Sequence, residues 1–279
     1  MKRVLVGMDC SQGSTDALLW AAQLARGCGA EVVVVAAFQR AQAELTPTDA
    51  EKLRLDAERM LTTEWVKPAR ELAPIRTLAI EGDPRDVLLH AADAEDADLV
   101  VVGSVGAGSA PGFLHFGSVA EYLTHHVTRP LAVVPAGVRG PVGQILLGVH
   151  GSTRDRTAVR WTAEVAAALD AAVLAVTVMI QPVDRDDHAM EPLIRDWTEP
   201  ITRAGVELLA ITVGGSLPAD GLLQAADRYR ADVVVMGAPR VGMTSRQRVG
   251  GAGIKLLHHT KLATVLVPAE WKLGDHAMA

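Results

Sequence analysis

The chain has 279 residues, more than the roughly 100–200 residues of a typical domain, so its length favours two domains. With a formal net charge of −6 it lacks the basic excess of a general nucleic-acid binder, and no apolar segment is long enough to span a bilayer. Apolar residues make up 49% of the chain and aromatic residues 4%, so we expect a core of Val, Leu, Ala and Ile, as in parallel α/β sheets. The two cysteines, Cys10 and Cys28, have neither CxxC nor metal-binding spacing, which favours reduced thiols in a cytoplasmic protein.

Buried strands and amphipathic helices alternate along the first half of the chain. Apolar runs without polar alternation are typical of strands that are covered on both faces of a sheet. They predict strands at 4–9, 31–37, 75–80, 99–103 and 131–135, the first of which ends in polar residues. Helices are expected at 17–25, at 47–72 with a break near Pro68, at 84–94 and at about 118–127. This alternation implies right-handed βαβ crossovers and a parallel, doubly wound sheet.

The second half of the chain repeats the pattern of the first. Residues 145–152 match 4–11 at an offset of 141, and Trp161 matches Trp20 at the same offset. Residues 231–237 match 97–103 at an offset of 134. We therefore predict two copies of one domain, at 1–138 and 142–271, joined by a Gly/Pro connector and followed by a tail at 272–279.

One glycine-rich stretch between the fourth strand and the next helix is the main candidate for a binding site. Glycines recur from Gly103 to Gly112 around Pro111, and the helical pattern resumes at Gly117-Ser118. Glycine lets the backbone approach a ligand closely, and a helix N-terminus offers unpaired N–H groups, so the stretch is typical of a phosphate site. It is not a P-loop, since GxxxxGK[ST] is absent, and it misses the third glycine of a dinucleotide fingerprint by one position.

Asp9 ends the first predicted strand, and ligands of open parallel sheets bind outside the carboxyl ends of the strands. Its carboxylate can accept a hydrogen bond from a ribose hydroxyl or an exocyclic amine. It can equally cap the helix that follows, where 11–15 supply further capping candidates. The sequence leaves both roles open.

These motifs together resemble the universal stress protein family in its tandem form. The resemblance rests on Gly7-x-Asp9-x-Ser11, Gly82-Asp83-Pro84, the stretch 97–106, Gly117-Ser118-Val119 and a proline at the end of the last strand, and it covers nearly the whole chain twice. It implies two tandem Rossmann-like (HUP-type) domains, each with a five-stranded parallel sheet flanked by helices. The family motif of Gly, two residues, Gly, nine residues, Gly and Ser/Thr marks members that bind ATP, with the adenine near the ends of the first two strands.

Carried over by position, the resemblance gives the first copy an ATP site. The base and ribose would lie near Asp9, and the phosphates would lie on the glycine loop and on backbone N–H groups of 117–119. Ten residues separate Gly106 from Gly117 where the motif has nine, and the loop has no Lys or Arg, so affinity would rest on backbone donors with or without Mg²⁺. The predicted nucleotide-binding residues are Gly7, Asp9, Ser11, Ala37, Gly103, Ser104, Gly106, Gly117, Ser118 and Val119.

The second copy has a weaker candidate site. Arg240 replaces the second glycine, Gly251 replaces the hydroxyl residue, and His150 stands where Asp9 stands. Either the arginine meets phosphate by charge, or the copy is degenerate and kept for packing. The candidate residues of this site are Gly148, His150, Gly237, Arg240, Gly250 and Gly251.

The function that we expect is that of a stress-response regulator that binds ATP and acts through nucleotide-dependent conformation or partner binding. No residue near the loop is a general base with a positioning partner, so any hydrolysis would be slow, and no side-chain metal site is predicted. A second copy of the chain, or a regulatory protein, is the expected macromolecular partner, with neither nucleic acid nor membrane. The alternatives are a nucleotide-free interaction module with vestigial clefts, and an adenylate-forming or transferase enzyme whose substrate-activating motif is not found.

Overall fold

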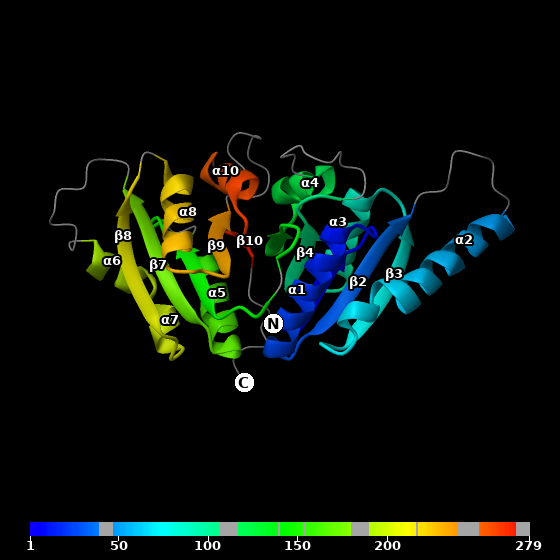
Figure 1. Ribbon diagram of the computed structural model, residues 1–279, viewed down its shortest axis with the longest axis horizontal. Coiled ribbons are helices and arrows are strands. Elements are labelled where there is room, and N and C mark those ends of the chain that lie inside the picture. The colour runs from blue at the N-terminus through cyan, green and yellow to red at the C-terminus, as the bar shows by residue number, and fades with distance from the viewer. Residues whose placement is uncertain are drawn as a thin grey trace. The chain divides into compact units, whose positions relative to one another are not determined.

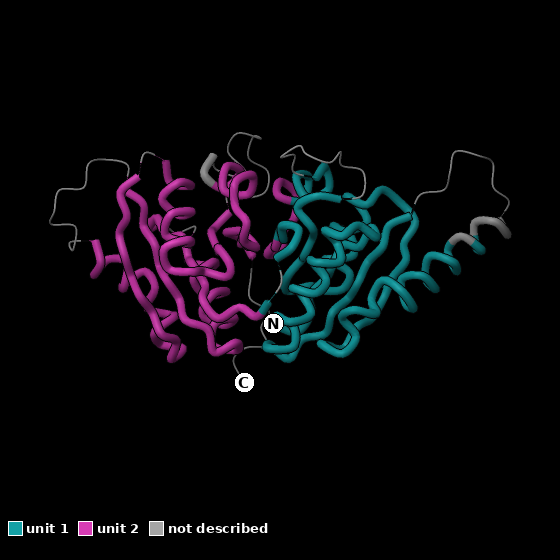
Figure 2. The backbone as a smooth tube through the Cα atoms, viewed as in Figure 1, with its two compact units in different colours: residues 1–123, 133–140 teal, residues 124–132, 141–279 magenta. Residues whose placement is uncertain are grey.

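The computed structural model describes residues 1–38, 47–106, 117–138, 140–152, 155–179, 190–215, 217–238 and 251–271. Contacts divide the chain into two compact units, coloured teal and magenta in Figure 2. Unit 1 comprises Met1–Leu123 and Val133–Gly140, and unit 2 comprises Thr124–Ala132 and Pro141–Ala279. The units are therefore not simply consecutive, because a short segment of the first half is counted with unit 2. The predicted tail at 272–279 lies outside the described residues.

In the first half of the chain, strands alternate with helices as expected (Figure 1). Parallel pairing gives the strand order β3-β2-β1-β4. The predicted break near Pro68 is confirmed, because the second helix ends in a π-helical turn, η1, and a 3₁₀ turn, η2. The elements are β1 (Arg3–Gly7), α1 (Gln12–Cys28), β2 (Glu31–Phe38), α2 (Pro47–Met60), η1 (Leu61–Trp65), η2 (Lys67–Ala69), β3 (Ile75–Glu81), α3 (Pro84–Ala94), β4 (Leu99–Gly103), α4 (Ser118–His126) and β5 (Leu131–Val134).

Unit 2 repeats this arrangement with the parallel order β10-β9-β6-β7-β8. Its central strands are buried, as in unit 1, because helices cover the apolar runs that the sequence shows. The predicted α/β class with parallel, helix-flanked sheets is confirmed. The elements are β6 (Gln144–Gly148), α5 (Asp155–Leu169), β7 (Ala172–Met179), α6 (Glu191–Trp197), α7 (Glu199–Arg203), β8 (Leu208–Gly214), α8 (Pro218–Arg228), β9 (Val233–Ala238), α10 (Gly251–His259) and β10 (Ala263–Pro268).

The strand order places a switch point beside β1. The chain runs from β1 through β2 to β3 on one side, and then returns to add β4 on the other side. Val4, Leu5 and Val6 of β1 pair in register with Leu99–Val101 of β4. The loops that follow β1 and β4 consequently leave the same edge of the sheet in opposite directions, which opens the crevice where ligands of such folds bind.

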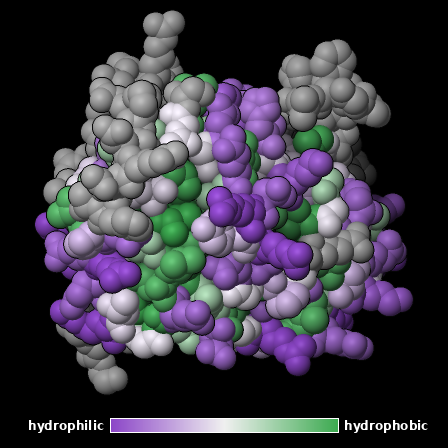
Figure 3. All heavy atoms as spheres, turned by 60° about the vertical axis from the view of Figure 1, so that its left-hand side comes forward, coloured by the Kyte–Doolittle hydropathy of each residue, from purple (hydrophilic) through white to green (hydrophobic). Residues whose placement is uncertain are grey.

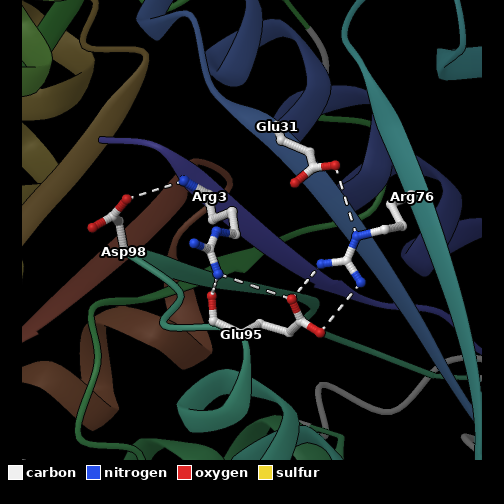
Figure 4. Close-up of polar contacts among 5 residues, drawn as sticks. All are labelled: Arg3, Glu31, Arg76, Glu95 and Asp98. Atoms are coloured by element: carbon white, nitrogen blue, oxygen red, sulfur yellow. Dashed lines mark hydrogen bonds and ion pairs between the residues drawn. The ribbon is translucent and has the colours of Figure 1, made fainter.

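At the amino ends of the strands, an aspartate ties β4 to β1 in unit 1 and another ties β9 to β6 in unit 2. The Asp98 carboxylate accepts hydrogen bonds from the backbone N–H groups of Lys2 and of Arg3. The bond from Arg3 is 3.0 Å long and is drawn in Figure 4. In unit 2 the Asp232 carboxylate accepts from the N–H groups of Gly143 and Gln144, both at 2.8 Å. The repeat therefore extends from the sequence pattern to individual hydrogen bonds.

Beside this tie, Glu95 lies between two arginines (Figure 4). The Arg76 guanidinium donates to both Glu95 carboxylate oxygens, one of them at 3.3 Å, and lies 3.7 Å from the Glu31 carboxylate. The hydrogen bond from Arg76, helped by the charges of Arg76 and Arg3, lowers the pKa of Glu95 below its ordinary value of 4.5. The ionised carboxylate is thus favoured in the folded chain.

This lowered pKa predicts a contribution to acid sensitivity. Because the folded-state pKa of Glu95 is the lower one, its stabilising effect is complete above the unfolded-state pKa and is lost as the pH falls through the folded-state value. We expect Glu95→Gln to lose less free energy of unfolding than the wild type as the pH falls from about 6 to about 3. Urea unfolding across this range measures the difference, and parallel pH profiles for the two proteins would contradict the prediction.

Apolar side chains are exposed at several places on the described surface. In the view of Figure 3, a strip of apolar residues runs between hydrophilic side chains. Three large apolar residues of unit 2 are among those that expose a substantial part of their surface: Leu193 on α6, Leu209 on the edge strand β8, and Leu217 before α8. None of the helices in the described ranges has both the length and the apolar character that a membrane crossing requires.

Candidate functional site

A cavity of about 330 Å³ opens at the switch point of unit 1. It lies outside the carboxyl ends of β1, β2 and β4 and is closed by the first turns of α1, α3 and α4. Nine of the ten predicted nucleotide-binding residues line it, all except Ser104. The described residues of the lining are Gly7, Met8, Asp9, Ser11, Ser14, Val35, Ala37, Pro84, Leu88, Val102, Gly103, Val105, Gly106, Gly117, Ser118, Val119 and Ala120.

Ser104 takes a different place, because its backbone joins the two ends of the glycine loop. Its N–H donates to the Val134 carbonyl at 2.9 Å, and its carbonyl accepts from the Gly117 N–H at 2.8 Å. These bonds fix the residue before α4 against the end of β4. The extra loop residue that the sequence places between Gly106 and Gly117 lies outside the described residues.

Glycines line the cavity where backbone segments approach one another. An ideal Cβ at Gly103 would lie 2.8 Å from the carbonyl carbon of Gly13, and one at Gly13 would overlap the carbonyl oxygen of Val105. The first turn of α1 therefore packs directly against the end of β4. At Gly7 a Cβ would come within 3.0 Å of the Leu88 side chain. Larger residues at these positions would need backbone shifts or would fill the cavity.

Asp9 organises the turn between β1 and α1. Its Oδ1 accepts hydrogen bonds from the Ser11 hydroxyl at 2.6 Å and from the Ser11 N–H at 3.1 Å. The N-cap of α1 is Ser11, whose side chain accepts from the Ser14 N–H. Of the two roles that the sequence left open for Asp9, direct capping of α1 is therefore wrong. Its other oxygen faces Gly106, where an ideal Cβ would lie only 2.6 Å away.

Asp9 is the one charged residue among the described residues of the cavity lining. Backbone N–H groups at the N-terminus of α4 supply partial positive charge there, as Ser118 and Val119 begin that helix. No group of three or more His, Cys, Asp or Glu suited to a metal ion occurs among the residues that the structure describes. A divalent cation would therefore need most of its ligands from a bound anion or from water.

An arginine links α3 and α4, two of the three helices that close the cavity. The Arg85 guanidinium donates to both carboxylate oxygens of Asp83, at 2.9 and 2.8 Å, and lies 5.4 Å from the ring centre of Tyr122 on α4. The side-chain bond from Arg85, followed by the Arg85 N–H, lowers the pKa of Asp83 to about 2. Asp83 is also the N-cap of α3, so this cluster fixes the first turn of α3 beside α4.

Sequence reasoning missed several cavity residues. Ser14 lies about one helical turn after the predicted Ser11, and Val105 lies next to the predicted Ser104 and Gly106. The spacing along α1 and along the loop could have indicated both residues. Pro84 belongs to a motif that the sequence analysis used as a helix start and for the family resemblance, but did not assign to the site. Leu88 lies one turn further along α3, and no local signal marks it, since its place depends on how α3 packs over β1.

In unit 2 the corresponding residues are only partly described. Gly148 ends β6, Gly237 lies in β9, and Gly251 begins α10, whereas Arg240 and Gly250 lie outside the described residues. The N–H of His150 donates to the Asp155 carboxylate at 2.9 Å, so an acidic residue on α5 holds this turn. In unit 1 the equivalent turn is held by the hydrogen bonds between Asp9 and Ser11. The two turns are alike in backbone and different in chemistry.

The geometry defines a class of protein: two tandem α/β units with parallel, doubly wound sheets, the first with a glycine-lined cavity at its switch point. The chain belongs to the universal stress protein family, whose model matches residues 1–135 and again 141–268. Universal stress protein Rv2624c of Mycobacterium tuberculosis H37Rv is 24% identical over 273 residues, which cover 96% of each chain. Universal stress protein Rv1636 of the same strain is 34% identical over 143 residues, 48% of this chain and 95% of that protein.

Comparison of structures agrees with this fold. A crystal structure of a universal stress protein from Archaeoglobus fulgidus DSM 4304 matches with a TM-score of 0.75 and 18% identity. The match covers 96% of this chain and 98% of that chain, so the shared fold extends over both units. The two matches of the family model confirm the predicted family.

Proposed function

We propose that unit 1 binds ATP in the glycine-lined cavity and that the protein acts as a cytoplasmic stress-response regulator. The observation that carries the proposal is the cavity itself, which gathers nine of the ten predicted residues from separate elements. Its volume of about 330 Å³ is within the range of small-molecule sites. The adenine and ribose would lie over Ala37 and beside Asp9, and the phosphates would meet the N–H groups of 117–119.

The chemistry of the lining supports binding more than turnover. Gly103, Gly106 and Gly117 leave the backbone open to a ligand, and the N-terminus of α4 favours its negative charge. Asp9 is engaged by Ser11, and the described lining holds no histidine or lysine that could move a proton. Slow hydrolysis at most is expected, with regulation through conformation or through a partner protein or second copy of the chain.

A direct test measures ATP binding to the purified full-length protein by calorimetry, with and without Mg²⁺, after its retained nucleotide has been identified and removed. We expect ATP to bind, and Asp9→Ala to weaken it at least tenfold, because a ribose or base hydrogen bond to a carboxylate is lost. Asp98→Ala is the matched control, since it removes an aspartate at the opposite end of the strands. No retained nucleotide, no heat of binding and no thermal shift would reject the proposal in favour of a nucleotide-free interaction module.

A further inference from the structure

A second cavity, of about 450 Å³, lies in unit 2 beside α5. At the offset of 141 its Ser152 and Asp155 correspond to Ser11 and Ser14 of the unit 1 cavity, and its other lining residues have no counterpart in that cavity. The second cavity is bounded by the turn after β6, by the first turns of α5, and by the junction of α6 and α7. We call it the α5 groove. Its described lining is Gly151, Ser152, Asp155, Arg156, Val159, Arg160, Asp196, Trp197, Glu199 and Pro200.

Two arginines of the α5 groove have charge available for a ligand. Arg156 and Arg160 are four residues apart on α5, so they lie on the same face of the helix, and both are exposed. Neither forms an ion pair or hydrogen bond with another residue of the described ranges. Exposed guanidinium groups side by side repel one another and are stabilised when an anion bridges them.

Two of the three carboxylates of the α5 groove are already engaged. Asp155 accepts hydrogen bonds from the backbone N–H groups of His150 and Ser152, at 2.9 and 3.0 Å. Glu199 forms an ion pair with Arg203. Asp196 remains on the far wall, formed by α6. The α5 wall thus carries two arginines and the buried, backbone-bound Asp155, while Asp196 and the Arg203-paired Glu199 lie on the opposite wall.

Comparison of the two copies shows that this charge is specific to unit 2. At the offset of 141, Arg156 corresponds to Thr15 and Arg160 to Leu19 in unit 1. Both copies keep the strand, the turn and the helix, so the fold does not require arginine at either place. The second copy has lost anchor residues of the glycine loop and has acquired cations at this other surface.

An aromatic ring forms another wall of the α5 groove. Trp197 ends α6 and is half-buried, and its six-membered ring lies so close to Gly151 that an ideal Cβ there would overlap it. The ring is thus held against the turn after β6 and still lines the cavity. A planar or apolar group beside it would gain contact area while an anionic group meets the arginines.

We propose that the α5 groove binds a small phosphate monoester with an apolar or planar substituent. The planar guanidinium groups of Arg156 and Arg160 hold the dianionic phosphate, because their paired N–H donors match its oxygens, and Trp197 contacts the substituent. This site is separate from the proposed ATP cavity in position and in residues. It gives the second unit a ligand of its own.

Phenyl phosphate is the probe, titrated calorimetrically into the full-length chain at low ionic strength. Inorganic phosphate, which lacks the ring, and phenol, which lacks the charge, are compared with it. We expect phenyl phosphate to bind most tightly, Arg156→Ala and Arg160→Ala each to weaken it roughly tenfold, and added salt to weaken it further. Trp197→Phe should retain the phosphate contribution and reduce the difference between phenyl phosphate and inorganic phosphate.

The controls separate this site from general charge effects and from the ATP cavity. Arg195→Ala removes an exposed arginine of α6 that does not line the α5 groove, and should leave binding unchanged. The titration is repeated in the Gly106→Ala variant, whose substitution lies in the unit 1 cavity. Binding of phenyl phosphate that persists in this variant is assigned to the α5 groove, whether or not unit 1 binds ATP. Absence of phenyl phosphate binding at millimolar concentration, or equal affinity for the wild type and an Arg156→Ala/Arg160→Ala double variant, would overturn the proposal.

Discussion

Gly106→Ala is expected to reduce the affinity of unit 1 for ATP at least tenfold while the chain stays folded. The added Cβ would lie 2.6 Å from Oδ2 of Asp9, so the carboxylate must move or the loop must shift outward. Movement of the carboxylate disturbs Ser11, which is held by the other oxygen of Asp9, and an outward shift of the loop displaces the Gly106 backbone that lines the cavity. Because the clash involves the end of a side chain and not a buried backbone, we expect the melting temperature to change by no more than about 2–4 °C.

Gly143→Ala is the matched control for this substitution. A Cβ at Gly143 would have the Asp232 carboxylate as its nearest neighbour, at 3.7 Å, which is ordinary contact. It should leave both ATP affinity and stability close to wild type. Calorimetric titration and a thermal melt of each variant give the two readouts. Wild-type ATP affinity in a folded Gly106→Ala protein would show that nucleotide does not contact this part of the cavity.

The fold could be predicted from the sequence because its signals are local. Uninterrupted apolar runs indicated buried parallel strands, and the matching offsets of 141 and 134 indicated two copies. The break near Pro68 followed from the chemistry of proline alone. The grouping of Thr124–Ala132 with unit 2 could not be predicted in this way, since it depends on contacts between segments far apart in the sequence.

The sequence predicted the position of those site residues that contribute through their backbone. Glycines after β1 and β4 were located by the chain direction, because parallel strands end at one edge of the sheet. The roles of side chains were harder to predict. Asp9 was expected to contact ligand or to cap α1. The capping role is wrong, because Asp9 holds Ser11, which is the cap, and the ligand contact stays a prediction. Ser104 lies in the motif, yet its backbone joins the loop ends outside the described cavity lining.

Differences between equivalent positions show how the copies diverged. Cys10 follows Asp9 in unit 1, and Gly151 follows His150 at the equivalent position of unit 2. Both adopt positive φ, 63° and 77°. The backbone conformation is thus a property of the shared turn. In unit 1 a side chain is accommodated there despite the strain, and Cys10 is exposed. In unit 2 the ring of Trp197 occupies the corresponding space, so glycine is required for two reasons.

Gly151→Ala is therefore expected to destabilise unit 2 by about 2–4 kcal/mol, the sum of left-handed backbone strain and overpacking against Trp197. Cys10→Ala, at the equivalent turn of unit 1, should change stability by less than about 0.5 kcal/mol, since a Cβ is already present at that φ. Urea unfolding, followed by hydrogen exchange in each unit, assigns the loss to one half of the chain.

The contribution of the ring can be separated from that of the backbone by a second substitution. In a Trp197→Ala background, Gly151→Ala has no ring to displace, so only the backbone strain of about 1 kcal/mol should remain. A smaller cost in this background means that the two positions are coupled, as expected of residues in direct contact. If Gly151→Ala cost the same with and without the indole, Trp197 would not be fixed against the turn, and the aromatic wall of the α5 groove would have to be abandoned.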